Sequence, residues 1–436
     1  MAGNDSRLDL DRLFGRFKNK VFPMHGTFFL GELALFAFVG LVATGTFLGL
    51  FYEPSTRLIE FEGSTVPAAY ASVLQIDSLS VGLLVRRIHH WSAHIMIAAI
   101  VVHMGRVYFS GAYKKPRDVN WLVGAILLQI TILAAFVGYL LPYDEFAVTA
   151  TSIGYQIAAS IPWIGETVSQ LVFAGPYPNP HLVPRFFTAH VFLIPAAIAG
   201  LIGLHLVILL KLKHTQHPDV TRRLKRSADR VRDRGLVGLP MWPEYTVMMG
   251  VLFLAYAAGV TLLAAVQPIH PVEAYGPPTA ETPLLRPDWY LLWIYGILKL
   301  IPALDITILG GTITAEFIGG IVVPGAIFGA IMAVPFVDAR VTGDVPEEPR
   351  YAELDRPRDR PGRTAIGIGA ITFFICAGIA GYLELLPITP TTMRAVTIVV
   401  PIIVGGLAYE GFKRSGEPES SRREGTESTR SEESLE

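Results

Sequence analysis

Four histidines in two apolar stretches have the residue type and the spacing needed to bind haem. His89 and His103 lie fourteen residues apart in RRIHHWSAHIMIAAIVVHMGR, and His190 and His205 lie fifteen apart in RFFTAHVFLIPAAIAGLIGLHLVILL. In a helix, fourteen residues span roughly 21 Å and return to within about 40° of the starting direction. Each stretch therefore presents two imidazoles on one side at two depths. Two facing pairs of this kind would ligate two stacked haems.

A single histidine in an apolar helix is more often a packing residue than a ligand. Two long-spaced pairs on separate apolar segments indicate function, because ionisable groups inside a membrane are costly. A spacing of fifteen turns about 60° past alignment. Pro195, which cannot complete the helical hydrogen bond, predicts a kink or a bulge that absorbs the extra residue.

Glycines repeat the same period in two other apolar segments. Gly31 and Gly45 are fourteen residues apart, and so are Gly124 and Gly138. Backbone without side chains at these two depths would give clearance to a flat macrocycle. Ordinary packing of small residues between membrane helices is the alternative.

Other polar residues near the histidines have weaker signals. His90 and His94 are spaced like a zinc pair, but no Glu lies between them and neither has a histidine fourteen residues on. We interpret both as non-ligands. Haem propionates near the interfaces would need cationic donors, for which the candidates are Arg86, Arg106 and Arg185. Anchoring at the membrane interface would explain each arginine equally well.

A second constellation is RPDWYLLWIYGILK, residues 286–299, in which Asp288 lies among Trp289, Tyr290, Trp293 and Tyr295. A carboxylate in aromatic, apolar surroundings is expected to have a raised pKa, which suits it to accept a proton from an apolar substrate. The alternative is an interfacial aromatic belt with an incidental acid.

Composition places most of the chain in a membrane. Of 436 residues, 51% are hydrophobic and only 17% are charged, against roughly 25% charged in soluble domains. The net charge of −1 suggests no nucleic-acid partner. The single cysteine, Cys376, excludes disulfides, thiolate clusters and CxxCH haem attachment within the chain. No cleavable signal peptide is evident in the polar, basic first 27 residues.

Hydropathy predicts an all-α integral membrane protein with eight transmembrane helices, the first four forming a di-haem bundle. The expected spans are 28–50, 88–108, 121–141, 187–210, 246–266, 314–335, 364–383 and 393–410. Basic residues precede the odd-numbered spans, so both termini are expected on the cytoplasmic side. The predicted divisions are a cytoplasmic segment 1–27, a four-helix domain 28–220, a basic linker 221–243, a C-terminal domain 244–412 and a disordered tail 413–436.

These residues together resemble the cytochrome b subunit of quinol:cytochrome c oxidoreductases, the bc and bf complexes. The resemblance covers about residues 20–385 and rests on five segments: RRIHHWSAH, HMGRVYFSGAYKKPRD, GYLLPYDEF, RFFTAH with HLV, and PDWYLLWIYGILK. The fifteen-residue spacing and the KKPRD loop are similar to the split, photosynthetic-type relatives. Both halves occur here in one chain, as in respiratory cytochrome b.

The resemblance implies two non-covalent b haems, with His89 and His190 ligating the low-potential haem and His103 and His205 the high-potential one. It implies quinol oxidation at an outer site, where Asp288 takes the acidic place and Tyr290, Tyr295 and Tyr139 line the pocket. One electron would pass to a Rieske iron–sulfur protein and the other through both haems to a quinone-reduction site near the cytoplasm, with proton translocation. The implied setting is the prokaryotic cell membrane, in lipid, with a c-type cytochrome subunit and as a homodimer.

Departures from the family pattern leave alternatives open. Asp288 stands where Glu is usual, Tyr143 and Glu145 alter the element around Pro142, and Leu210 replaces a quinone-site histidine. The cytoplasmic quinone site is therefore poorly defined, with candidates Lys211, Lys213, His25 and Glu244. A di-haem membrane anchor that passes electrons between a soluble oxidoreductase and quinone is one alternative. A transporter with proton-relay histidines is another.

Overall fold

The computed structural model describes residues 20–23, 25–212, 214–215, 232–233, 236–269, 272, 275–276, 286–343 and 354–416. Within these residues, eight helical segments are long and apolar enough to cross a membrane. They are Gly26–Phe51, Ser80–Phe109, Asp118–Tyr139, Leu182–Leu212, Met241–Val266, Ala315–Thr342, Pro361–Ala380 and Pro390–Ser415. Each overlaps one predicted span, which confirms the all-α membrane fold.

The elements behind these spans are mostly single α-helices. They are α2 (Leu30–Phe51), α4 (Ser80–Phe109), α5 (Asp118–Tyr139), α8 (Leu182–Thr188) with α9 (Ile194–Leu212), α11 (Thr246–Val266), α13 (Ala315–Phe317) with α14 (Val323–Thr342), α15 (Pro361–Ala380) and α16 (Pro390–Gly416). Shorter helices connect them: α3 (Ala68–Ser78), α6 (Glu145–Ala159), α7 (Gly165–Phe173) and α12 (Trp289–Leu300). Helix α16 stays helical through Gly416, beyond the predicted start of the tail at Lys413, and the rest of the predicted tail lies outside the described residues.

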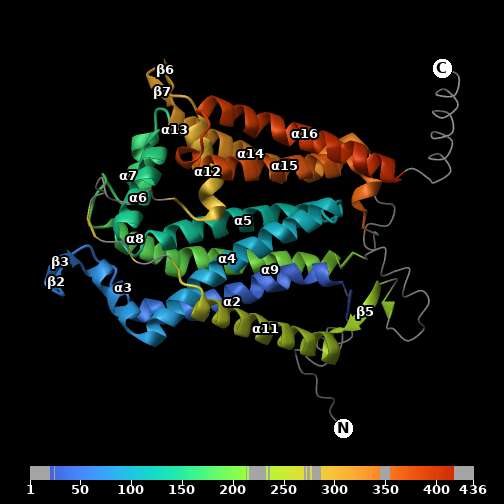
Figure 1. The fold of residues 1–436 in the computed structure, drawn as a ribbon. Helices are drawn as coiled ribbons and strands as arrows, with labels where there is room; N and C mark the ends of the chain where they lie inside the picture. Colours follow the sequence, from blue (N-terminus) through green and yellow to red (C-terminus); the bar gives the residue numbers. More distant parts are fainter. Residues whose placement is uncertain are drawn as a thin grey trace, which may run out of the picture.

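The first four spans form one bundle, in which α2 packs on α4 and α5 packs on α9, while α11 covers α4 from outside (Figure 1). The small side chain of Ala37 lets α2 approach a core that contains Met96, Ile198 and Val260. The hydroxyl of Tyr256 donates to Ser92 Oγ at 2.8 Å, so the polar groups in this core are paired.

The fourth span contains the predicted bulge. Between α8 and α9, residues Ala189–Leu193 form a π turn, and the amide of Ile194 donates to the carbonyl of Ala189, five residues back. Such single π turns insert one residue into an α-helix. The turn begins one residue before His190 and ends two residues before Pro195. It accounts for the fifteen-residue spacing of His190 and His205.

The last three spans and α12 form a second group beside α5 (Figure 1). Helices α15 and α16 pack at close range, because Gly369 and Gly405 lie against each other without side chains. Helix α12 packs on α15, and its Trp293 and Ile297 are buried there.

Short strands complete the described structure. Strand β1 (Val21–Pro23) pairs antiparallel with β5 (Leu236–Pro240), which also pairs with β4 (Arg232–Asp233). Two hairpins are formed by β2 (Leu58–Phe61) with β3 (Ser64–Pro67), and by β6 (Asp305–Ile308) with β7 (Gly311–Thr314). Of the predicted basic linker, residues 221–231, 234 and 235 lie outside the described residues.

Hydrogen bonds and ion pairs join the two helix groups at the end where α4 meets the KKPRD loop. Trp121 Nε1 donates to the carbonyl of Ile331 at 2.7 Å, and Tyr108 Oη donates to that of Arg363 at 3.0 Å. The Asp355 carboxylate lies 2.8 Å from Lys114 Nζ and 2.7 Å from the buried Arg363 guanidinium. Arg363 also contacts Asp338 at 3.3 Å.

Candidate haem and quinol site

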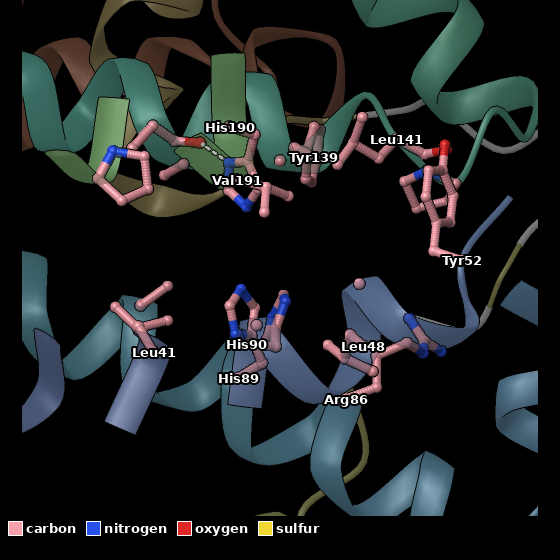
Figure 2. Close-up of a pocket in the computed structure, with 18 of the residues that line it drawn as sticks. Leu41, Leu48, Tyr52, Arg86, His89, His90, Tyr139, Leu141, His190 and Val191 are labelled. Atoms are coloured by element: carbon pink, nitrogen blue, oxygen red, sulfur yellow. Dashed lines mark hydrogen bonds between the residues drawn. The ribbon is translucent and has the colours of Figure 1, made fainter. Parts of the chain in front are cut away.

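The structure brings His89 of α4 opposite His190 of the π turn, across the inside of the bundle (Figure 2). Their ring centroids are 6.2 Å apart. Because a metal–imidazole nitrogen bond is about 2 Å long, this separation leaves room for one iron between the two rings. The spacing therefore fits a bis-imidazole haem.

Hydrogen bonds at the Nδ1 atoms of His89 and His190 orient both imidazoles for metal binding. Thr44 Oγ1 donates to the carbonyl of Gly40 at 2.7 Å, so it can accept from His89 Nδ1 at 2.9 Å. His190 Nδ1 lies 2.9 Å from the carbonyl of Ala134, an acceptor only. Both Nδ1 atoms therefore carry hydrogen, and both Nε2 atoms keep a lone pair for a metal. Metal-ligating histidines usually have such partners.

Each of the four glycines that share the fourteen-residue period lies against one of the four histidines. A Cβ atom would come within 3.1 Å of His89 at Gly45, 3.4 Å of His103 at Gly31 and 3.6 Å of His205 at Gly124, and at Gly138 it would overlap His190. The pattern in the sequence thus corresponds to four places where backbone passes an imidazole at close range.

The second histidine pair, His103 and His205, lies further along the same two helices, toward Arg106. After the orientation predicted from the sequence, it is called the inner pair, and His89 with His190 the outer pair. Arg106, one turn past His103, is largely enclosed, with its guanidinium 4.1 Å from the Phe28 ring. Its Nη2 atom is buried and has no hydrogen-bond partner among the described residues. A buried guanidinium nitrogen without a hydrogen-bond partner could accommodate the carboxylate of a haem propionate.

An apolar cavity of about 330 Å³ joins the outer histidine pair to the predicted proton acceptor. Its lining includes His89 and His190, the backbone of Gly45 and Gly138, and the side chains of Tyr139, Asp288 and Tyr290. A volume in this range suits a small organic ligand. Asp288 therefore shares one cavity with two histidines that lie far from it in the sequence.

The environment of Asp288 differs from the predicted one. Burial by itself raises the pKa of this carboxyl, but His94, His90 and the Tyr290 hydroxyl outweigh burial and bring the pKa below its ordinary value. Tyr290 Oη donates to Asp288 Oδ2 at 3.0 Å, and its own pKa is raised well above the ordinary value by burial and by Asp288. The expectation of a raised pKa was wrong because the sequence did not show that two histidines from α4 face Asp288.

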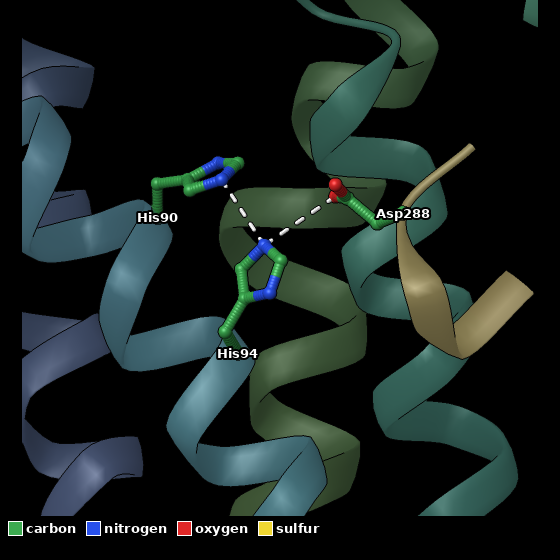
Figure 3. Close-up of side chains that lie close together, drawn as sticks. All are labelled: His90, His94 and Asp288. Carbon is green, nitrogen blue, oxygen red and sulfur yellow. Dashed lines mark hydrogen bonds and ion pairs between the residues drawn. The ribbon is translucent and has the colours of Figure 1, made fainter. Parts of the chain in front are cut away.

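These histidines are His90 and His94, interpreted from the sequence as non-ligands (Figure 3). Their Nε2 atoms lie 3.0 Å apart, and His94 Nε2 lies 3.6 Å from Asp288 Oδ2. The three ligand atoms lie within 4.8 Å of one another. The sequence showed the i, i+4 spacing of the two histidines. It did not show that Asp288, from a distant segment, would lie beside them.

Three other predicted site residues have different surroundings from those expected. Tyr295 is not among the cavity-lining residues, and its ring lies 4.1 Å from the Lys299 ammonium. Arg86 lines the cavity but is paired with Asp77, with Nε 2.6 Å from Oδ1. Arg185 donates to the carbonyl of Leu171.

Comparison with known proteins identifies the fold family. Residues 94–277 match the family Cytochrome b(N-terminal)/b6/petB, and residues 278–349 match Cytochrome b(C-terminal)/b6/petD. A cytochrome bc1 complex cytochrome b subunit of Streptomyces coelicolor is 36% identical over 86% of this chain and 69% of the relative. One of Mycobacterium leprae is 33% identical over 94% of this chain and 76% of the relative. The chain belongs to the cytochrome b family.

A solved structure shares the fold over nearly the whole chain. A chain of a hyperthermophilic respiratory Complex III superposes with a TM-score of 0.67 and 22% identity, covering 94% of this chain and 96% of its own. Cytochromes b bind haem b, and the bis-histidine geometry and glycine contacts of this chain fit that cofactor.

The cytochrome b described here also has a polar cluster that the sequence did not reveal. At the inner end of the bundle, Tyr245 Oη donates to Glu32 Oε1 at 2.7 Å, close to Arg106. An acid inside a membrane span was the available signal for Glu32. Among the residues that the sequence suggested for the cytoplasmic quinone site, Lys211 and Glu244 are exposed, and Lys213 lies outside the described residues.

Proposed function

We propose that this chain is the di-haem, quinol-oxidising cytochrome b subunit of a bc1-type complex, EC 7.1.1.8-like in activity. The observation that carries the proposal is the single cavity lined by His89, His190, Asp288 and Tyr290. With a haem between His89 and His190, a substrate would occupy the part of the cavity near Asp288, where it would contact a proton acceptor and lie beside the redox centre. Quinol oxidation requires both, because protons and electrons leave together.

Two haems would be held by His89 with His190 and by His103 with His205. Six-coordinate bis-imidazole haem supplies one-electron transfer, without an open position for oxygen. Thr44 and Ala134 fix the tautomers of the outer pair, and Gly45 and Gly138 leave space beside the rings. Arg106, whose buried Nη2 atom has no hydrogen-bond partner among the described residues, would pair with a propionate of the inner haem.

Asp288 would act as the general base for quinol oxidation. Its lowered pKa keeps it ionised at neutral pH, so it is ready to take a proton when quinol binds. Tyr290 would steady the carboxylate through its hydroxyl, and Tyr139, which lines the same cavity, would pack against the substrate. Asp288 and its hydrogen-bond partner Tyr290 both line the cavity, so the carboxylate would be within reach of a bound substrate.

A quinone-reduction site is proposed at the inner end of the bundle, near His103 and His205. The polar groups available there are the hydrogen-bonded Glu32 and Tyr245 and the neighbouring Arg106. Reduction takes up protons, which the Glu32 carboxyl could exchange, while Arg106 would supply positive charge. A charge that crosses the whole membrane potential is worth about 2.3 kcal/mol per 100 mV, so redox centres held at two depths would couple electron transfer to that potential.

The proposed partners are a Rieske iron–sulfur protein and a c-type cytochrome subunit, within a homodimeric complex in the prokaryotic cell membrane. Support comes from the relatives, which are described as subunits of cytochrome bc1 complexes. Both termini are proposed to face the cytoplasm, by the distribution of basic residues between the spans.

Purification of the native complex through a tag on this chain tests the proposal. We expect b-type bands in reduced-minus-oxidised spectra, a Rieske signal in paramagnetic resonance, and oxidation of a short-chain quinol by the purified complex. Purification of b haems with a soluble dehydrogenase, no Rieske signal and no quinol oxidation would instead identify a di-haem membrane anchor. Absence of b-type bands would overturn haem binding altogether.

A further inference from the structure

The side chain of His94 has a fixed hydrogen-bonding state that the proposed mechanism has not used. Trp289 Nε1 lies 3.0 Å from His94 Nδ1, and an indole nitrogen can only donate. His94 Nδ1 therefore accepts and carries no proton. The neutral ring must then carry its hydrogen on Nε2, the atom that faces Asp288 and His90 (Figure 3).

This Nε2–H donor lies between two acceptors. His90 Nε2 is at 3.0 Å, within hydrogen-bond range, and Asp288 Oδ2 is at 3.6 Å, a few tenths of an ångström outside it. A small rotation of either side chain would move the hydrogen bond from one acceptor to the other. An ionised carboxylate attracts the donor more strongly than a neutral carboxyl group, because charge-assisted hydrogen bonds are about twice as strong.

A metal site on the same three side chains is the competing interpretation, since their spacing would suit one. It would require a lone pair on His94 Nε2, and hence a proton on Nδ1. That proton would face the Trp289 N–H, donor against donor. The contact between Trp289 and His94 therefore favours a hydrogen-bond donor over a metal ligand.

We propose that His94 is a positioning residue for quinol oxidation, whose fixed Nε2–H holds the Asp288 carboxylate toward the cavity and releases it on protonation. The inference rests on the proposed function. In the step concerned, a proton moves from the quinol oxygen to a carboxylate oxygen of Asp288, leaving the quinol anion and a neutral acid. His94 neither gains nor loses a proton, and its hydrogen bond returns to His90. The freed acid can then turn away from the substrate.

Two substitutions distinguish loss of the Nε2–H donor of His94 from loss of its imidazole ring. His94→Asn places an amide oxygen near the position of Nδ1, so it keeps a partner for Trp289, but has nothing that reaches Asp288. His94→Gln places an amide N–H near the position of Nε2. The other groups that face Asp288 are unchanged in both variants: His90 of α4, Tyr290 of α12 and Tyr139 of α5.

The measurement is the rate of short-chain quinol oxidation against pH by purified complexes of equal b-haem content. We expect His94→Asn to move the acid limb of the profile about one unit upward, because loss of a donor to a carboxylate changes its proton affinity about tenfold. His94→Gln should restore most of the wild-type profile. In an Asp288→Asn background, His94→Asn should have no further effect.

A wild-type profile for His94→Asn would overturn the inference, as would equal slowing by Asn and Gln with the acid limb unmoved, which indicates packing alone. A wild-type complex that does not oxidise quinol would overturn the proposed function instead. The two failures are therefore distinguishable.

Discussion

The imidazole of His190 lies directly against the backbone of Gly138, so close that any side chain at position 138 would overlap the ring. The partner contact at the inner pair, Gly124 with His205, has more room, because a Cβ atom there would sit at an ordinary 3.6 Å. Gly124 and Gly138 therefore differ in how much room they leave between the backbone of α5 and the neighbouring imidazole.

Gly138→Ala should therefore displace His190 and weaken the outer haem, whereas Gly124→Ala should be tolerated. Overpacking of this kind typically costs about 1–3 kcal/mol. Potentiometric titration of reduced-minus-oxidised spectra resolves the two b components. We expect the outer component to be lost or shifted in Gly138→Ala and unchanged in Gly124→Ala. Equal behaviour of the two variants would contradict the difference in clearance.

Replacing either histidine of a pair should remove the same haem. His89→Ala and His190→Ala should each abolish the same spectral component, because that haem needs ligands from both helices, and His103→Ala and His205→Ala should each abolish the other. Difference spectra of purified membranes provide the measurement. Loss of one and the same component in His89→Ala and His103→Ala would show that the pairing is wrong.

Asp288→Asn should assemble with both haems but oxidise quinol about 10²–10⁴ times more slowly, the usual effect of removing a general base. The pKa of Asp288 is depressed, so the ionised base is present above that value and is lost as the pH falls through it. Wild-type activity should therefore persist into mildly acidic buffer, and the variant should lack this acid limb. Turnover at the wild-type rate between pH 6 and 8 would exclude Asp288 as the base.

The ion-pair cluster around Asp355 should contribute to stability. Burial opposes ionisation, but Lys114 and Arg363 lower the pKa of Asp355, so its contribution is present above the unfolded pKa and is lost as the pH falls through the folded one. At neutral pH, Asp355→Asn should cost on the order of 3 kcal/mol, because it removes one of the two carboxylates that pair with the buried Arg363 and also the partner of the partly buried Lys114.

Thermal unfolding of the detergent-solubilised protein, followed by tryptophan fluorescence, measures this effect. Glu53→Gln is the matched control, since it breaks the exposed pair with Arg57 and should change stability by less than about 1 kcal/mol. The difference between Asp355→Asn and wild type should shrink in strongly acidic buffer. A difference that is the same at all pH values would contradict an electrostatic origin.

Much of the fold was readable because a membrane imposes simple rules on sequence. Eight apolar runs gave eight spans, and the extra residue between His190 and His205 predicted a bulge that the π turn provides. The glycine period predicted clearance for a flat macrocycle, and in the structure each of these four glycines lies against one of the four imidazoles. Each of these signals lies within one helix, where spacing fixes direction.

Contacts between distant segments could not be read in the same way. Asp288 meets His94, almost two hundred residues earlier in the chain, so the sign of its pKa shift was predicted wrongly. Arg86 is engaged by Asp77 of α3, and Tyr295 faces Lys299 and is not among the residues that line the cavity. The Glu32–Tyr245 hydrogen bond also joins the first and fifth spans. The spacing of residues within one helix does not show which residues of another helix will contact them.

The bonds that join the two halves of the chain have a consequence for how the polypeptide can be divided. Trp121 with Ile331, Tyr108 with Arg363, and Ser92 with Tyr256 all connect residues before position 212 to residues after position 240. Together with the pairing of β1 and β5, they bind the halves through side chains and strands on both sides of the connecting segment. A break in the covalent chain between residues 216 and 231 would leave every one of these bonds in place. The fold is thus compatible with two separately made polypeptides that assemble in the membrane, as well as with one.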